Sequence, residues 1–331
     1  MQWSNLGLAR WRFEKGLHDL GGGVYAWLQP DGGWGWSNAG LIADGGQSLL
    51  VDTLFDLPLT REMLAAMGDA EPAAAQIDTL VNTHADADHC NGNQLVEGAE
   101  IIASQAAAEE LARIDPAQMR ALLQSYEGDD SATGRFVRSA FGSFDFEGLR
   151  PAPPTRSFAE RELELKVGDK RVLLYQVGPA HTRGDVLVHL PAEGVVYTGD
   201  IMFVEGTPII WTGPVQNWID ACQRICDLQP AAVVPGHGPI TDSRGAQAMG
   251  AYLSYVRDEA RQRYEGGMPA AEAARDIPLG EFAGWRNPER LAVNVRTLYR
   301  EFGGGGDAAG GLGSREILAQ MAELADLAGS Q

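Results

Sequence analysis

Short apolar runs alternate with helical patterns through the first 105 residues. Apolar runs of about four to eight residues, bounded by Gly, Pro, Asn or Asp, are typical of buried strands. A helix is expected between two of these runs, over residues 57–68. The strands that this pattern predicts are GVYAWLQ (23–29), SNAGLIAD (37–44), GQSLLVDT (46–53), IDTLVNT (77–83) and AEIIAS (99–104).

The pattern becomes helical between residues 105 and 150, and we interpret this stretch as a helical insertion. A hairpin is expected next, because two strand-like runs flank a turn at Asp169-Lys170. Its strands are LELKVG (163–168) and RVLLYQVG (171–178). The remaining elements expected in a main α/β domain over residues 1–240 are strands at 186–191, 194–200 and 231–238 and a helix at 217–229.

The chain beyond residue 240 is almost wholly helical, which predicts a C-terminal helical extension over residues 241–331. A glycine-rich tether at 303–313 divides this extension. Packing onto the body is the first expectation for its last helix, and a homo-oligomer contact is the alternative. The apolar face of that helix consists of Ile317, Leu318, Met321, Leu324 and Leu327.

Composition excludes several classes of function. The 331 residues carry a net charge of −19, so there is no basic field for binding nucleic acid or an anionic membrane. No apolar stretch approaches the roughly 18 residues that span a bilayer, and residues 1–16 lack the apolar segment of a signal peptide. Three cysteines are too few for a disulfide framework. The sequence therefore predicts a cytoplasmic protein.

Four of the six histidines stand in short motifs directly after predicted strands, together with several aspartates. Loops at strand ends are where functional groups converge in layered α/β folds. Each motif alone has a plainer explanation: a single strand-end histidine is commonly structural, and an aspartate often caps a helix. Together they predict ligands for two metal ions about 4 Å apart. The residues are His84, Asp86, Asp88 and His89 in THADADHC, His181 in GPAHTRGD, Asp200 in YTGD and His237 in PGHGP.

In these motifs the sequence resembles the metallo-β-lactamase fold superfamily of hydrolases. The family pattern is an Asp that ends an early strand (here Asp52), T-H-x-H-x-D-H, G-x-x-H-T-x-G, an acidic bridging ligand and a late G-H, and the match covers residues 22–240. The resemblance implies an αβ/βα sandwich with a dinuclear metal site at one edge of its two sheets. It also makes residues 1–240 the catalytic domain.

The resemblance implies a ligand set for two divalent metal ions, with zinc as the first choice. His84, residue 86 and His181 hold the first ion. The second ion is held by Asp88, His89 and His237. Asp200 bridges the two ions, and Asp52 orients the ligand loops from behind.

The chain departs from the family at Asp86, where histidine is usual. The di-iron branches of the superfamily also have a carboxylate there, as Glu. Asp86 therefore leaves iron and manganese open beside zinc. If Asp86 instead points away from the site, the first ion is lost or weakly held, and a non-catalytic binding protein is the remaining interpretation.

Three tryptophans are candidates for substrate binding. Trp34 and Trp36 lie in PDGGWGWSN, a hairpin loop that overhangs the metals in the superfamily, and Trp211 lies in WTGP. Indole rings offer flat apolar area for an acyl chain or a planar polyketide; the alternative is that they cap the core. GGWGWSNAGLI, TPIIWTGP and NPERLAVNVRTLYREF are further similar to a bacterial subgroup that includes thioesterase/cyclases of aromatic polyketide pathways.

The two other histidines are expected to be structural: His189 lies in a predicted strand, and His18 precedes the first one on the surface. The leading hypothesis is a metal-dependent hydrolase of a small-molecule thioester, ester or lactone, in which a hydroxide bound by both metals attacks the carbonyl. Asp88 and Asp200 are its catalytic carboxylates; Asp88 positions the nucleophile and is a candidate proton relay. The alternative is a di-iron oxidoreductase or oxygenase at the same carboxylate-rich site.

Overall fold

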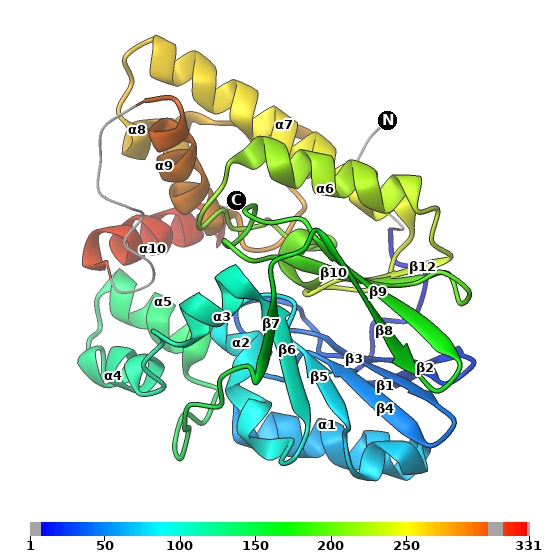
Figure 1. Cartoon of the computed structure of the whole chain (residues 1–331). Coiled ribbons are helices and arrows are strands. Elements are labelled where there is room, and N and C mark those ends of the chain that lie inside the picture. Colours follow the sequence, from blue (N-terminus) through cyan, green and yellow to red (C-terminus); the bar gives the residue numbers. More distant parts are fainter. Residues whose placement is uncertain (1–7, 304–313, 330–331) are drawn as a thin grey trace.

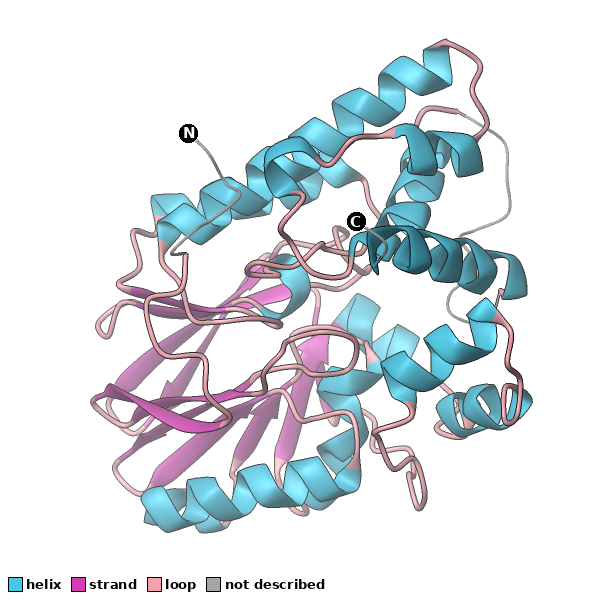
Figure 2. Cartoon of the chain, turned by 180° about the vertical axis from the view of Figure 1, so that it is seen from behind, coloured by secondary structure: helices cyan, strands magenta, loops and turns pink. Residues whose placement is uncertain are grey.

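Two β-sheets lie face to face between outer layers of helices in the computed structural model, which describes residues 8–303 and 314–329 (Figure 1, Figure 2). This arrangement confirms the predicted αβ/βα sandwich. Within the described residues, no helix is long and apolar enough to cross a membrane.

The first sheet has seven strands in the order β1 to β7. Strands β1 to β4 pair antiparallel, whereas β4 to β7 pair parallel. Parallel neighbours need a crossover connection, and helix α1 (Leu57–Ala70) supplies the one between β4 and β5. The strands are β1 Gly16–Gly21, β2 Val24–Leu28, β3 Ala39–Asp44, β4 Gln47–Val51, β5 Thr79–Val81, β6 Glu100–Ser104 and β7 Arg156–Phe158.

The second sheet has five strands in the order β12-β11-β10-β9-β8. β8 and β9 form the predicted hairpin, and β11 pairs parallel with β12 across helix α6 (Val215–Asp227). The strands are β8 Glu162–Val167, β9 Lys170–Gln176, β10 Val186–Leu190, β11 Val195–Tyr197 and β12 Ala232–Val234.

The central strands are buried on both faces. In β3 and β4, Ile42 and Leu49 belong to the apolar layer between the two sheets, whereas Leu41 and Leu50 pack with residues of α1. Successive side chains of a strand point to opposite faces, so a strand covered on both sides is apolar at most of its positions. This explains why the strand runs in the sequence are continuous instead of alternating.

The predicted insertion is helical between β6 and β7, with α3 (Gln105–Leu111), α4 (Gln118–Ser125) and α5 (Ala132–Phe141). The aromatic residues near the end of this insertion pack around one residue outside it. Phe141, Phe144 and Phe146 surround Phe55, with ring centroids 6.3, 4.8 and 4.9 Å from it. The insertion is thereby fixed to the loop that follows β4.

The C-terminal extension begins with α7 (Ser243–Glu265), which packs along α6, and its last helix α10 (Arg315–Gly329) lies against α5 (Figure 1). Ile317, Leu318 and Met321 are buried, so packing onto the body is confirmed for this face, but Leu327 is 49% exposed. Apart from Gly303, the tether expected at 303–313 lies outside the described residues. The other helices are α8 Ala270–Asp276 and α9 Leu291–Glu301, with short helices η1 Pro72–Ala75, α2 Ala87–Cys90, η2 Asn91–Leu95, η3 Gly199–Ile201, η4 Gly280–Phe282 and η5 Pro288–Arg290.

Strands β1 and β7 were not predicted. β1 is the edge strand GLHDLG, which has few β-branched or aromatic residues and therefore no strand signal. The expectation that His18 precedes the first strand is wrong, because His18 lies inside β1. Its Nε2 is 2.8 Å from the carbonyl oxygen of Glu14, and its side chain is half-buried.

Candidate metal centre

Loops at the ends of strands from both sheets bring the seven expected ligands together at one edge of the sandwich. His84 and Asp86 follow β5, and Asp88 and His89 lie on the short helix α2 that comes next. From the second sheet, His181 precedes β10, while Asp200 and His237 follow β11 and β12. Their nitrogen and carboxylate oxygen atoms form closely spaced groups suited to metal ions.

One group consists of His84, Asp86, His181 and Asp200. The Oδ2 of Asp86 lies 3.1 Å from His181 Nε2 and 4.0 Å from His84 Nε2, so Asp86 points into the site. Two ligand atoms on one tetrahedral ion, each about 2.0–2.1 Å from it, are about 3.4 Å apart. The spacing of this group therefore suits a single ion.

The second group consists of Asp88, His89 and His237. His237 Nε2 lies 3.2 Å from Asp88 Oδ2, and His89 Nε2 lies 3.9 Å from the same oxygen. Asp200 stands between the groups: its Oδ2 is 3.4 Å from both His181 Nε2 and His237 Nε2. A carboxylate in that position can contact an ion on either side.

The hydrogen bonds of the imidazoles fit metal binding. In His84, His89 and His181, Nδ1 contacts a protein oxygen, which leaves Nε2 facing the centre. The Nε2 atoms of His84 and His89 and Oδ1 of Asp200 are buried and make no hydrogen bond of suitable direction, although His89 Nε2 lies 3.0 Å from Asp200 Oδ1. Buried polar atoms are normally paired, so this set of inward-facing nitrogen and oxygen atoms fits a bound cation. His237 differs, because its Nδ1 is the unpaired atom.

Asp52 holds the ligand loops from behind. One carboxylate oxygen accepts from the backbone N of Thr83 (2.7 Å), and the other accepts from Thr83 Oγ1 (2.6 Å) and lies 3.0 Å from His89 Nδ1. The residue has a φ of 62°, a left-handed backbone conformation that Asp tolerates better than most residues. Asp52 thereby joins the end of β4 to the motif after β5.

Asp185, which the sequence did not single out, has a similar position behind His181. Its carboxylate accepts from the backbone N atoms of Ala180 and Thr182 and from Thr182 Oγ1 (2.6 Å). These bonds close the turn that carries His181. The signal was present in the sequence as the final Asp of GPAHTRGD.

Gly236 lets the loop of His237 approach Asp200. A Cβ at this position would overlap Oδ1 of Asp200 and the backbone of Gly199. The glycine in PGHGP is therefore required by the close approach of two ligand loops.

Burial and the facing carboxylates together set the charges of the histidines. Burial opposes protonation of His181, but Asp86 and Asp200 outweigh it and raise its pKa to about 9. Burial also opposes protonation of His89, but Asp200 and Asp88 outweigh it and raise the pKa of His89. His84 has a lowered pKa because burial and its neighbour His89 disfavour its charge. Metal ligation needs neutral imidazoles, so metal binding releases protons here.

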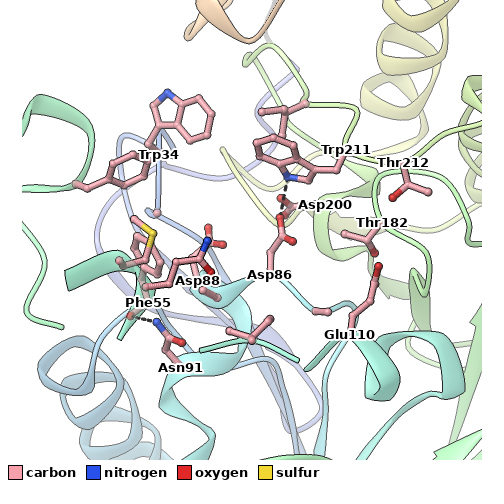
Figure 3. Close-up of a pocket in the computed structure, with 18 of the residues that line it drawn as sticks. Trp34, Phe55, Asp86, Asp88, Asn91, Glu110, Thr182, Asp200, Trp211 and Thr212 are labelled. Atoms are coloured by element: carbon pink, nitrogen blue, oxygen red, sulfur yellow. Dashed lines mark hydrogen bonds between the residues drawn. The ribbon is translucent and has the colours of Figure 1, made fainter. Parts of the chain in front are cut away.

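A cavity of about 620 Å³ lies over these ligands. Trp34 and Trp211 stand on opposite sides of it, with Asp86, Asp88 and Asp200 between them (Figure 3). Phe55 lies beside Trp34, and Glu110 and Thr182 lie on the side of Trp211. Phe141, whose ring packs on Trp34, and Met119 add apolar lining. The cavity thus has one apolar and one polar wall above a floor of candidate metal ligands.

The three tryptophans have different surroundings. Trp211 donates from Nε1 to Asp86 Oδ2 (3.1 Å), and Trp34 donates to Glu289 Oε1 (2.6 Å). Trp36 does not line this cavity; its ring packs on Phe144 with centroids 4.7 Å apart, beside a separate cavity of about 290 Å³. Of the three, only Trp34 and Trp211 can meet a molecule that lies over the ligands.

Known proteins resemble this chain in sequence and in fold. The acyl-coenzyme A thioesterase MBLAC2 of Gallus gallus is 26% identical over 230 residues, which is 66% of this chain and 78% of the relative. The corresponding protein of Homo sapiens is 25% identical over 233 residues, with 66% and 79% covered.

Among solved structures, the sec-alkylsulfatase Pisa1 from Pseudomonas sp. has a TM-score of 0.65 and 17% identity, with 90% of this chain and 51% of that chain covered. A metallo-β-lactamase from Pontibacter korlensis has a TM-score of 0.55 and 18% identity, with 73% and 99% covered. These structures show the fold alone, whereas the family and the thioesterase relatives support a hydrolase. The family model of the metallo-β-lactamase superfamily matches residues 32–237, most of the chain, and the chain therefore belongs to that superfamily.

Proposed function

We propose that the chain is a metal-dependent hydrolase of acyl thioesters. The observation that carries the proposal is that the buried Nε2 atoms of His84 and His89 face Asp200, 3.9 and 3.0 Å from its carboxylate oxygens, on the floor of a cavity of about 620 Å³. The thioesterase relatives favour a thioester over the esters and lactones that share its reactive carbonyl.

Seven residues would hold two divalent ions. His84, Asp86 and His181 form the first site, and Asp200 lies between it and the second. When bound, two such ions supply a water of lowered pKa and polarise a carbonyl oxygen. Zinc, iron and manganese all suit this mixture of imidazoles and carboxylates. The second site consists of Asp88, His89 and His237.

The chain's own side chains position the reactants. Asp88 lines the cavity with its carboxylate 3.2 Å from His237 Nε2, where it can orient the attacking water and accept its proton. Burial opposes the charge of Asp88, but His89 and His237 outweigh it and lower its pKa, so this carboxylate is ionised at neutral pH. The apolar wall around Trp34 and Phe55 suits an acyl chain and excludes water from it.

Thiol release from acyl-coenzyme A tests the proposal, with an aryl ester and a lactone as comparison substrates on protein of defined metal content. His89→Ala and His237→Ala are expected to lose at least about a hundredfold in rate and to keep the circular dichroism of the wild type. His18→Ala is the control, because this histidine lies in β1, outside the ligand groups. Full activity in either ligand variant would contradict the proposal.

A di-iron oxidoreductase is the second candidate, because three of the seven ligands are carboxylates, Asp86, Asp88 and Asp200. Visible absorption of the protein as isolated distinguishes the two. An oxo-bridged ferric pair absorbs visible light, whereas zinc is redox-inert and colourless. Visible bands together with absent thiol release would favour the oxidoreductase.

A further inference from the structure

The wall of the metal cavity contains a buried arginine to which the proposed hydrolysis gives no role. Arg290 ends the short helix η5 in the C-terminal extension and is only 2% exposed. It lines the cavity together with Asp88, Asp200 and His237. A positive side chain is therefore held close to the floor where the chemistry is expected.

The guanidinium of Arg290 has fewer partners than its donors require. Of its five N–H donors, one on Nη1 donates to the carbonyl oxygen of Thr207 (2.9 Å), and Nε is buried without a partner. Within residues 8–303 and 314–329, no carboxylate oxygen lies within 4.0 Å of it. Aromatic rings flank it instead: its Cζ is 4.4 Å from the centroid of Trp34 and 5.0 Å from that of Phe203.

The neighbouring acid does not satisfy this arginine. Glu289 is buried beside it, but its Oε1 accepts from Trp34 Nε1 (2.6 Å) and from Asn287 Nδ2 (3.2 Å). Glu289 thus serves to fix the Trp34 loop on the extension. A buried charge without a bonded counter-ion is unfavourable, so Arg290 has free capacity for an anion.

Other charged groups around the cavity also favour the binding of an anion. Three carboxylates on the floor do not balance two divalent ions, so the floor adds no negative charge for Arg290 once ions are bound. Arg300 also lines the cavity, and its Nε is buried without a partner. Apart from the three floor carboxylates, the lining contains three arginines, Arg113, Arg290 and Arg300, and two acidic residues, Glu110 and Asp115. Cationic groups therefore outnumber acidic ones above the floor, in a chain of net charge −19.

We propose that Arg290 binds a carboxylate on the acyl part of the substrate, so that the preferred substrates are thioesters of dicarboxylic acids. An arginine fork matches a carboxylate with two parallel hydrogen bonds, and the Trp34 and Phe203 rings hold this fork in place. The substrate class in this inference rests on the proposed thioester hydrolysis. The binding of an anion by Arg290 rests on the cavity alone.

The depth of Arg290 assigns it to the acyl part. A thioester carrier such as coenzyme A also has anionic oxygens, on its phosphates. Those groups are bulky and hydrated and belong at the mouth of the cavity, where Arg113 is exposed. Arg290, at 2% exposure beside Asp88 and His237, is placed for a group that enters with the acyl chain.

The test compares two acyl groups on two carriers. Glutaryl and pentanoyl have the same chain length and differ in one carboxylate; coenzyme A and N-acetylcysteamine differ in the phosphates. The wild type is expected to prefer glutaryl at least about tenfold in kcat/KM on both carriers, since a hydrogen bond to a charged group has about this effect. Arg290→Met should remove that preference, and Arg290→Lys should reduce it. Arg296→Met is the matched control, because Arg296 lies on α9, pairs with Glu316 and does not line the cavity.

Direct binding makes the test independent of turnover and of the variant's folding. Titration calorimetry of zinc-loaded wild type should show glutarate binding at least about tenfold more tightly than pentanoate. Equal affinities, or a glutaryl preference that persists in folded Arg290→Met, would overturn the inference. If Arg290→Met instead lowers kcat/KM for both coenzyme A thioesters and for neither N-acetylcysteamine thioester, Arg290 binds the phosphates of the carrier. That result would also overturn the inference. If no thioester is hydrolysed, the proposed function fails, while the glutarate titration still decides the anion site.

Discussion

The indole Nε1 of Trp211 donates a hydrogen bond to Asp86 Oδ2 at 3.1 Å (Figure 3). The same oxygen lies 3.1 Å from His181 Nε2, so Trp211 fixes the ligand position at which this chain departs from its family. Helix α9 in turn fixes the loop that carries Trp211: Asn294 Oδ1 accepts from the N of Ile210, and Thr297 Oγ1 donates to its carbonyl oxygen. The C-terminal extension thus supports the metal centre through one loop.

Trp211→Phe is expected to weaken metal binding at the first site by about 10–100-fold, because the variant loses the hydrogen bond that orients Asp86. Competition with a chromophoric chelator measures the affinity. Trp36→Phe is the matched control, since Trp36 packs on Phe144 away from the ligands. If both variants bind metal like the wild type, Trp211 does not position Asp86.

Trp34→Ala is expected to lower the free energy of unfolding by about 3–5 kcal/mol. Trp34 is 9% exposed, packs edge-to-face on Phe141 at 5.8 Å and donates to Glu289, so its loss leaves a void and an acceptor without its donor. Urea unfolding followed by circular dichroism measures the change. An unchanged midpoint with a raised KM for bulky acyl groups would instead assign Trp34 to substrate binding alone.

The grouping of the candidate ligand residues was predictable because each motif is local in sequence. THADADHC contributes four of these residues within a short stretch, and strand-end loops of an α/β sandwich meet at one edge. The bond between Trp211 and Asp86 was not predictable, since it joins residues 125 positions apart in the chain. The same holds for Arg290, whose place in the cavity depends on how the C-terminal extension packs.

The fold was predictable where strands are buried on both faces. Short apolar runs such as Leu49-Leu50-Val51 in β4, bounded by turn residues, are typical of central strands. The edge strands β1 and β7 lack such runs, because most of their side chains are exposed or only half-buried and so need not be apolar. Pairing with β2 and β6, not local propensity, makes them strands.

Gly40→Ala is expected to lower the free energy of unfolding by about 1–3 kcal/mol. A Cβ at Gly40 in β3 would overlap the ring of Tyr197, which is buried between the sheets and donates to the carbonyl oxygen of Tyr25 at 2.8 Å. Gly68→Ala is the control: it lies in α1 with no atom closer than 3.6 Å, and should be neutral or stabilising by about 0.5 kcal/mol. Equal thermal midpoints for both variants would contradict this packing.

Glu110→Gln should change how stability depends on pH. Burial raises the pKa of Glu110 to about 7 from 4.5, so the folded protein holds this proton more tightly than the unfolded chain. The contribution of this proton to the free energy of unfolding therefore falls as pH rises from about 4.5 to about 7, and it stays constant at higher pH. In chelator-treated protein, the stability of Glu110→Gln relative to wild type should increase between pH 5 and pH 8. Glu109→Gln, which makes the same charge change at the adjacent position, is the matched comparison. A difference between Glu110→Gln and wild type that stays constant over this range would contradict the raised pKa of Glu110.

Asp86→His is expected to shift metal content toward zinc. A carboxylate is a harder, anionic ligand than imidazole, and oxygen donors favour manganese or ferrous iron relative to softer sites. With Asp86 and Asp200, the first site has two carboxylates beside His84 and His181. The wild type should therefore contain iron or manganese beside zinc when grown in a medium that supplies all three. Asp86→Glu is the control for disturbance of the loop. It keeps a carboxylate at this position and should keep the wild-type fraction of iron or manganese. Elemental analysis of the three proteins is the measurement; zinc at both sites of the wild type, unaltered by the histidine, would show that residue 86 does not select the metal.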